Sequence, residues 1–208
     1  MGRNNQEPVV VVSGVPRSGT SMMMQVLKAG GMSILADDLR VPDRHNARGY
    51  YELESVRLTP RDAQWIRRAP GMAVKVVFRL LYHLPPDYRY RVLFMRRNLA
   101  DVISSQDAML ASLGRQATPD PRRLLAVLRE ELSACRRWME VQPNLAVLYV
   151  DYERMLSCPA ERASRVAEFL DRDLDLPAMA AAVDPQLWHW GRQLGDHRLP
   201  LTRPPVFG

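Results

Sequence analysis

A glycine-rich loop is the first segment of the chain whose residue types could do chemistry. Residues 14–21 read GVPRSGTS, with the glycine spacing of the Walker A phosphate-binding loop but with Thr20 in place of its lysine. The backbone N–H groups of such a loop and the start of the following helix form a cradle for an anion. The sequence therefore predicts a phosphate site made by Pro16, Arg17, Ser18, Gly19, Thr20 and Ser21.

An arginine and a serine form a second candidate anion site. Residues 96–105 read RRNLADVISS and follow a segment typical of a strand. Arg97 would leave the end of that strand, and Ser105 lies two helical turns further on. A guanidinium group binds phosphate through its planar fork. Because the carboxyl ends of parallel strands share one edge of a sheet, we expect this site to face the glycine-rich loop.

Both segments resemble the cofactor motifs of sulfotransferases that use 3′-phosphoadenosine 5′-phosphosulfate (PAPS). Residues 14–21 are similar to the family's 5′-phosphosulfate loop, and Arg97 and Ser105 have the spacing of its 3′-phosphate motif. A third similar piece comprises a strand at 145–150, the residues DYE at 151–153 and a helix that ends at 170. The resemblance is to bacterial members, with some likeness to tyrosylprotein and carbohydrate sulfotransferases. It implies transfer of a sulfuryl group from PAPS to a hydroxyl acceptor, with 3′-phosphoadenosine 5′-phosphate (PAP) as product.

Sulfuryl transfer needs in-line attack, a base for the acceptor proton and a cation near the leaving oxygen. Lys75, one of two lysines in the chain, lies on a predicted strand, and several family members place a lysine similarly. It is our candidate for stabilising the leaving oxygen. The transfer can proceed without a metal, so we expect no metal site.

Three residues are candidate bases, and the sequence leaves the choice between them open. Asp38 lies 21 residues after Arg17, a spacing that resembles that of the catalytic glutamate of tyrosylprotein sulfotransferases. Glu52 ends the stretch NARGYYE, which looks like a segment of many bacterial sulfotransferases. His83 follows Lys75 by eight residues, and cytosolic sulfotransferases use a histidine base. Each acid could instead pair with a neighbouring arginine.

Alternating strands and helices must position these side chains. The β-branched run at 9–12 predicts a strand buried on both faces. Further strands are predicted at 73–78, 90–95 and 145–150, and helices at 20–29, 99–113, 121–141 and 159–170. Residues 53–68 are predicted to be mostly helical, with a helix start at Thr59-Pro60. The pattern indicates a P-loop-type, three-layer α/β/α fold with a mainly parallel sheet.

The composition is that of a globular protein with an excess of positive charge. Its 208 residues are 47% hydrophobic and 25% charged, which suggests a single domain over 1–208. Segments 33–60 and 184–208 are predicted to form the acceptor site or a lid. The net charge of +6 is spread along the chain, so we expect it to attract an anionic cofactor and not nucleic acid. The absence of a long apolar run and the two cysteines, Cys135 and Cys158, favour the cytoplasm and no membrane span.

Other functions stay open at this point. The main alternative is a P-loop nucleotide kinase or phosphotransferase with a degenerate Walker A loop, against which the missing lysine at Thr20 argues. A nucleotide- or nucleic-acid-binding module without chemistry is a third hypothesis. The sequence does not distinguish a small-molecule acceptor from a glycan or a peptide, and it does not indicate the oligomeric state.

Overall fold

A parallel four-stranded sheet forms the centre of the computed structural model, which describes residues 7–37, 39 and 49–184. Its strands are β1 (Val9–Gly14), β2 (Ala73–Lys75), β3 (Tyr90–Arg96) and β4 (Leu145–Asp151), in the order β2-β1-β3-β4. Val11 of β1 stands opposite Val74 of β2 and Val92 of β3. All the strand pairs are parallel, so the carboxyl ends of the strands meet at one edge.

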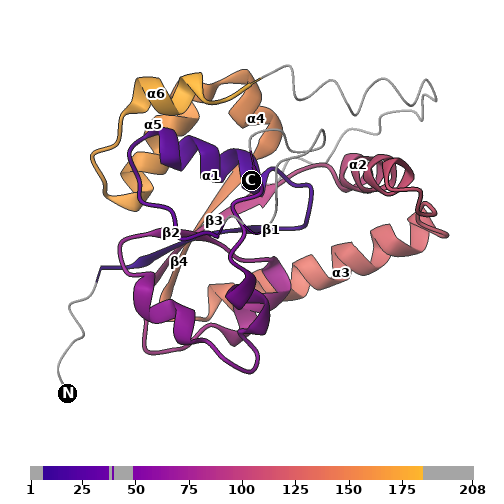
Figure 1. The fold of residues 1–208 in the computed structure, drawn as a ribbon, viewed down its shortest axis with the longest axis horizontal. Helices are drawn as coiled ribbons and strands as arrows, with labels where there is room; N and C mark the ends of the chain where they lie inside the picture. The colour runs from indigo at the N-terminus through magenta and orange to yellow at the C-terminus, as the bar shows by residue number, and fades with distance from the viewer. Residues whose placement is uncertain (1–6, 38, 40–48, 185–208) are drawn as a thin grey trace.

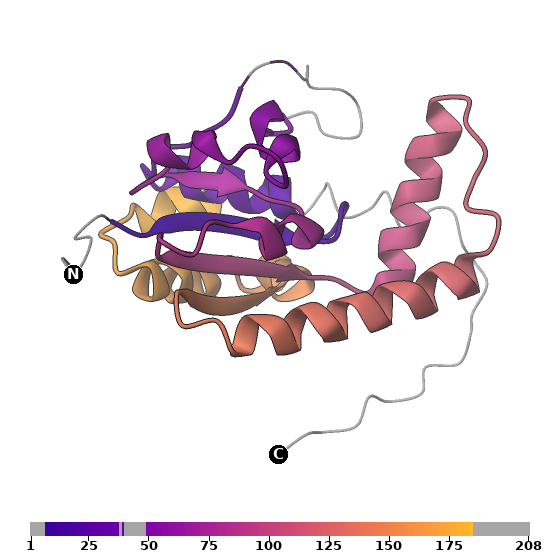
Figure 2. The ribbon, with the colours of Figure 1, turned by 90° about the horizontal axis from the view of Figure 1, so that it is seen from below.

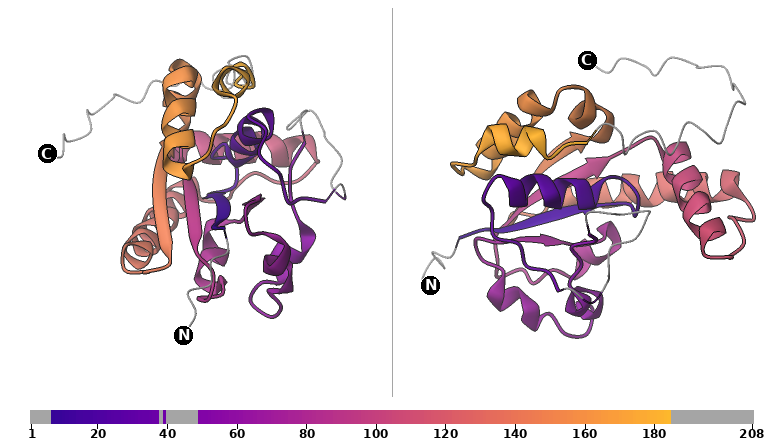
Figure 3. Two further views of the ribbon diagram at one scale, coloured as in Figure 1. Left: turned by 90° about the vertical axis from the view of Figure 1, so that its left-hand side faces the viewer. Right: turned by 45° about the horizontal axis from the view of Figure 1, so that its top comes forward.

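Helices cover both faces of this sheet. The α-helices are α1 (Thr20–Ala29), α2 (Leu99–Ser112), α3 (Pro121–Glu140), α4 (Tyr152–Ser157), α5 (Pro159–Leu170) and α6 (Leu176–Ala181). The 3₁₀ helices are η1 (Glu54–Leu58), η2 (Gln64–Arg68) and η3 (Phe78–His83). Figures 1 and 3 show α1, α4, α5 and α6 on one face, with the 3₁₀ helices on the other. The predicted α/β fold with a mainly parallel sheet is confirmed.

The alternation of side chains along β1 explains why both faces must be covered. All six residues of β1 are buried. Val9 and Val11 belong to a hydrophobic cluster with residues of η1–η3 and α3, whereas Val10 and Val12 pack with residues of α1 and α5. A strand that is apolar on both faces is stable only between two layers of helix.

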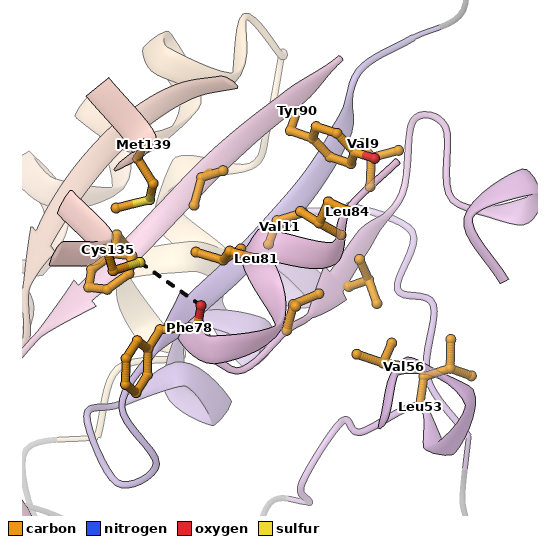
Figure 4. Close-up of a cluster of buried hydrophobic side chains, with 14 of the residues drawn as sticks. Val9, Val11, Leu53, Val56, Phe78, Leu81, Leu84, Tyr90, Cys135 and Met139 are labelled. Atoms are coloured by element: carbon orange, nitrogen blue, oxygen red, sulfur yellow. Dashed lines mark hydrogen bonds between the residues drawn. The ribbon is translucent and has the colours of Figure 1, made fainter. Parts of the chain in front are cut away.

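Cys135 illustrates the packing of the first cluster, part of which Figure 4 draws. Its thiol donates a hydrogen bond to the Phe78 carbonyl over 4.0 Å, as the dashed line in Figure 4 marks. Burial raises the pKa of the Cys135 thiol, which therefore stays protonated and acts as an apolar core side chain.

Two predicted elements differ from the observed ones. The second strand was predicted over 73–78 but ends at Lys75. The Val76 N–H still donates a hydrogen bond to the Val12 carbonyl over 3.0 Å, and η3 then begins at Phe78. The helix predicted within 53–68 is instead the two 3₁₀ helices η1 and η2. Thr59 connects them, since its hydroxyl accepts a hydrogen bond from the Trp65 indole N–H over 3.0 Å. This local contact holds the chain in a turn at Thr59-Pro60, where the sequence predicted a break, but the second helix starts later, at Gln64.

The helices α2 and α3 extend past the end of the sheet, as Figure 2 shows. Of the two predicted acceptor or lid segments, 33–60 is described only at 33–37, 39 and 49–60, and 184–208 only at Asp184. Their predicted roles therefore stay predictions. Within the described ranges, no helix combines the length and the apolar character needed to cross a bilayer.

Candidate active site

The glycine-rich loop lies at the carboxyl end of β1 and leads directly into α1. Gly14 and Gly19 have φ angles of 146° and 99°, which L-residues rarely adopt. A Cβ atom at Gly14 would lie 2.5 Å from the Ser18 hydroxyl, and one at Gly19 would lie 2.5 Å from the ring of Tyr152. The tight turn of this loop therefore depends on both glycines.

The start of α1 has the features of an anion cradle. Gly19 caps the helix without a side-chain hydrogen bond, and the first turn holds no acidic residue. The Ser18 hydroxyl is buried and finds no hydrogen-bond partner within the described part of the chain. Unpaired N–H groups at a helix start attract phosphate or sulfate oxygens, so these residues fit the phosphosulfate group of PAPS.

Two arginines join this loop to the second predicted motif. The Arg17 guanidinium donates a hydrogen bond through Nε to the Ser105 hydroxyl over 3.0 Å. Arg97 donates through Nη1 to the Arg17 carbonyl, also over 3.0 Å. The Arg97 Nε atom is buried and has no hydrogen-bond partner among the described residues. Arg17, Arg97 and Ser105 thus form one basic cluster at the carboxyl edge of the sheet.

Lys75 meets the loop from the other side, at the end of β2. Its side chain is only 10% exposed. The ammonium nitrogen lies 2.6 Å from the Tyr50 carbonyl, 3.2 Å from the Glu52 carboxylate and 3.3 Å from the Ser21 hydroxyl. A cation taken out of water needs such partners. The Lys75 side chain is therefore fixed by these contacts beside the start of α1 and does not extend into solvent.

The three candidate bases have different places in the structure. Glu52 forms an ion pair with Lys75, and its side chain is 39% exposed, so the pair is open to solvent on one side. His83 is exposed and ends η3, from which the chain leads toward the amino-terminal end of β3. Asp38 lies outside the described residues. Glu52 is thus the candidate that the structure brings to Lys75.

Two tyrosines that the sequence analysis did not single out complete the site. The ring of Tyr152 lies beneath the Arg97 guanidinium, 4.5 Å from its carbon, and would meet a Cβ at Gly19. Burial raises the pKa of Tyr152, so its phenol is neutral. Its position directly after β4, at the same edge as the loop, was the signal that could have identified it.

Tyr50 contributes through its backbone. Its carbonyl accepts hydrogen bonds from both Lys75 and the Ser21 hydroxyl, the latter over 3.4 Å. The next residue, Tyr51, has a φ angle of 50°, a left-handed conformation that is uncommon for a large side chain. Residue type does not reveal such a backbone contact, and no sequence signal could have identified it.

Carboxylates and imidazoles do not gather in this region as metal ligands do. Among the residues that the structure describes, no group of three or more histidine, cysteine, aspartate or glutamate side chains could hold a metal ion. The positive charges near the loop come instead from Arg17, Arg97 and Lys75. The arrangement can bind two anionic groups and place a lysine–carboxylate pair beside one of them.

Several solved structures resemble this chain. The sulfotransferase domain from the curacin biosynthetic pathway has a similar fold, with a TM-score of 0.52 and 15% identity, over 94% of this chain and 93% of that one. Sulfotransferase STF9 from Mycobacterium avium is 14% identical, with a TM-score of 0.49, over 91% and 69%. Mouse sulfotransferase SULT7A1, solved in complex with PAP, is 15% identical, with a TM-score of 0.49, over 85% and 62%.

A match to a family model shows to which protein family this chain belongs. No curated protein matches this chain. The family model of the sulfotransferase domain, however, matches residues 7–191, most of the sequence and all the residues of the site described above. The chain therefore belongs to the sulfotransferase domain family.

Proposed function

We propose that this protein transfers a sulfuryl group from PAPS to the hydroxyl group of an acceptor and releases PAP. The observation that carries the proposal is the hydrogen-bonded chain from Arg97 to the Arg17 carbonyl and from the Arg17 guanidinium to Ser105. It links two anion sites of different kinds, a backbone cradle and an arginine cluster. PAPS carries two anionic groups, a 5′-phosphosulfate and a 3′-phosphate, which these two sites would bind.

The backbone cradle would hold the phosphosulfate. Ser18 and the start of α1 offer donors to it, and Thr20 and Ser21 add hydroxyl groups. Arg97 would bind the 3′-phosphate together with Ser105, since its Nε is buried without a hydrogen-bond partner in the described part of the chain.

Lys75 and Glu52 would carry the transfer itself. A bond forms from the acceptor oxygen to sulfur while the bond from sulfur to the phosphate oxygen breaks, and its electron pair stays on that oxygen. The Glu52 carboxylate would take the acceptor proton, and the Lys75 ammonium would stabilise the charge on the leaving oxygen. No step in this scheme requires a metal. Asp38 stays the alternative base, and His83 receives no role in this scheme.

The kinase alternative has less support. A kinase loop uses a lysine to reach the terminal phosphate, and the chain has Thr20 there. The family match is to sulfotransferases.

The compartment and the acceptor complete the proposal. Both cysteines are free thiols, which supports a reducing compartment such as the cytoplasm. The acceptor is a small molecule, a glycan or a peptide with a hydroxyl group.

Ligand-induced stabilisation tests the proposal. PAP without metal should raise the melting temperature, since a ligand at 100 times its Kd stabilises the folded state by about 2.7 kcal/mol. ADP, and ATP with magnesium, are the comparisons. Stabilisation by ATP and magnesium alone would overturn the proposal and favour a kinase.

A further inference from the structure

Tyr152 lies between the two proposed anion sites and contacts both of them. It directly follows β4, and only 7% of its surface is exposed. Its ring centroid lies 4.5 Å from the carbon of the Arg97 guanidinium group. The edge of the same ring lies against Gly19, since a Cβ atom there would be 2.5 Å from Tyr152 Cδ2. One buried side chain thus joins the glycine-rich loop to the arginine cluster.

The order of the strands brings Tyr152 to Arg97. Arg96 stands opposite Asp151 on the last rung between β3 and β4, and two hydrogen bonds of 2.9 and 3.0 Å join their side chains. Arg97 and Tyr152 are the next residues after this pair, so their contact continues the register of the strands beyond the sheet. The position of Tyr152 in the chain therefore determines which arginine its ring meets.

The Arg97 guanidinium group is held on its face and at one nitrogen atom. A cation over the face of an aromatic ring is attracted by the π electrons, most strongly where water is excluded. Nη1 of Arg97 also donates a hydrogen bond to the Arg17 carbonyl over 3.0 Å. Nε is buried and has no hydrogen-bond partner among the residues that the structure describes. The ring and the carbonyl therefore fix the plane of the group, and Nε is left for an anion.

A fixed guanidinium group binds phosphate better than a mobile one. An arginine side chain loses rotational freedom when it binds an anion, and this loss weakens the binding. Contacts that hold the side chain beforehand reduce the loss. Tyr152 should therefore strengthen phosphate binding by Arg97 without touching the phosphate itself.

We propose that Tyr152 is a positioning residue for the 3′-phosphate of the donor, and that it acts through its ring on Arg97 and not through its hydroxyl group. The inference rests on the proposed function, which assigns the 3′-phosphate to Arg97 and Ser105. Tyr152 then contributes to the preference for nucleotides that carry a 3′-phosphate. A residue that only fills the core would affect the binding of all nucleotides equally.

Calorimetric titration with PAP and with adenosine 5′-phosphate tests this inference, because the second nucleotide lacks only the 3′-phosphate. The ratio of the two Kd values measures the preference for the 3′-phosphate and is insensitive to a general loss of stability. Tyr152→Leu removes the ring, and Tyr152→Phe removes only the hydroxyl group. Tyr149→Leu is the matched control, since the Tyr149 ring centroid lies 5.4 Å from the guanidinium carbon of Arg96, which is outside the cluster.

The wild type, Tyr152→Phe and Tyr149→Leu should prefer PAP to the same extent, within about twofold. Tyr152→Leu should lose about fivefold or more of this preference, a size expected for a desolvated contact between an arginine and an aromatic ring. If Tyr152→Leu does not fold, Tyr152→Met makes the same comparison, because its longer side chain fills more of the space beside Gly19.

A smaller change of preference in Tyr152→Leu would overturn the inference. Equal weakening of both nucleotides in that variant would do so too, because the ring would then act on the nucleoside and not on the 3′-phosphate. An equal loss of preference in Tyr152→Phe or Tyr149→Leu would assign the effect to the hydroxyl group or to a general change at the strand ends. In all these cases a wild type that prefers PAP leaves the proposed function in place. A wild type that binds both nucleotides equally has no 3′-phosphate site, and the proposed function then fails together with this inference.

Discussion

Arg97 donates a hydrogen bond over 3.0 Å to the backbone carbonyl of Arg17, a residue 80 positions earlier in the chain. Arg17 has a φ angle of 74°, a left-handed conformation that costs about 1–3 kcal/mol for a residue with a side chain. The contact from Arg97 and the Arg17–Ser105 hydrogen bond both stabilise this conformation. The loop and the arginine cluster therefore form one unit, and a change in either should affect both.

Arg97→Ala should weaken PAP binding by about 10- to 100-fold, because charge-assisted hydrogen bonds contribute roughly 1.5–3 kcal/mol each. Calorimetric titration with PAP measures this change. Arg122→Ala, at an exposed position of α3, removes the same charge and should leave PAP affinity within about twofold. Equal losses in the two variants would indicate a general effect of net charge and contradict the assignment.

Glu52→Gln should lower kcat by about 10²- to 10⁴-fold and leave PAP affinity almost unchanged, because the amide cannot take the acceptor proton. Steady-state kinetics with PAPS and an acceptor found by screening measure the change. Glu54→Gln is the control, since Glu54 is an exposed residue of η1 that pairs with Arg57.

The same kinetics decide between the two acidic candidates. Asp38→Asn should retain most of the wild-type kcat if Glu52 is the base. A loss confined to Asp38→Asn would instead assign the proton transfer to Asp38 and leave Glu52 as the partner of Lys75.

Gly19→Ala should destabilise the fold and abolish PAP binding. The alanine would have to keep the φ of 99°, which is unfavourable for a residue with a side chain. Its Cβ atom would also lie 2.5 Å from the Tyr152 ring. Gly31→Ala separates the two effects, since Gly31 has a φ of 89° but no atom within 4 Å of its added Cβ. Gly31→Ala should cost only about 1–2 kcal/mol, the conformational penalty, and should retain PAP binding. Urea unfolding and PAP titration of both variants provide the comparison, and equal losses of stability would contradict it.

Tyr90 should make the free energy of unfolding fall above pH 10. Burial raises the pKa of Tyr90 well above its usual 10.0, and its hydroxyl donates to the Pro85 carbonyl over 2.7 Å. In the unfolded chain the phenol ionises at a lower pH, so stability is present below pH 10 and is lost at up to about 1.4 kcal/mol per pH unit above it.

Tyr90→Phe removes the contribution of Tyr90 to this dependence, whereas the other buried groups with raised pKa, such as Tyr152, keep theirs. The variant should be less stable than the wild type by about 1 kcal/mol at pH 8, because the hydrogen bond to Pro85 is missing. The difference should shrink as the pH rises from 10 to 11, as urea unfolding at several pH values would show. A constant difference across this range would contradict the prediction.

The sheet and the loop at its edge could be predicted from the order of the residues. A run of four β-branched residues at 9–12 is typical of a strand buried on both faces of a parallel sheet, and β1 has this place. The spacing of Gly14 and Gly19 specifies the turn from strand to helix, because both residues adopt φ angles that few others tolerate. These are local properties, so the order of residues is enough to reveal them.

Which charged groups come into contact could not be predicted in this way, because it depends on how the chain folds. Lys75 and Glu52 are neighbours because β2 ends beside the start of α1 and the segment before η1 returns to the same place. Arg17 and Ser105 are 88 residues apart and meet because β1 and β3 are adjacent in the sheet. Spacing along the chain carries no information about such contacts, because they depend on the order of the strands and on the paths of the connections between them.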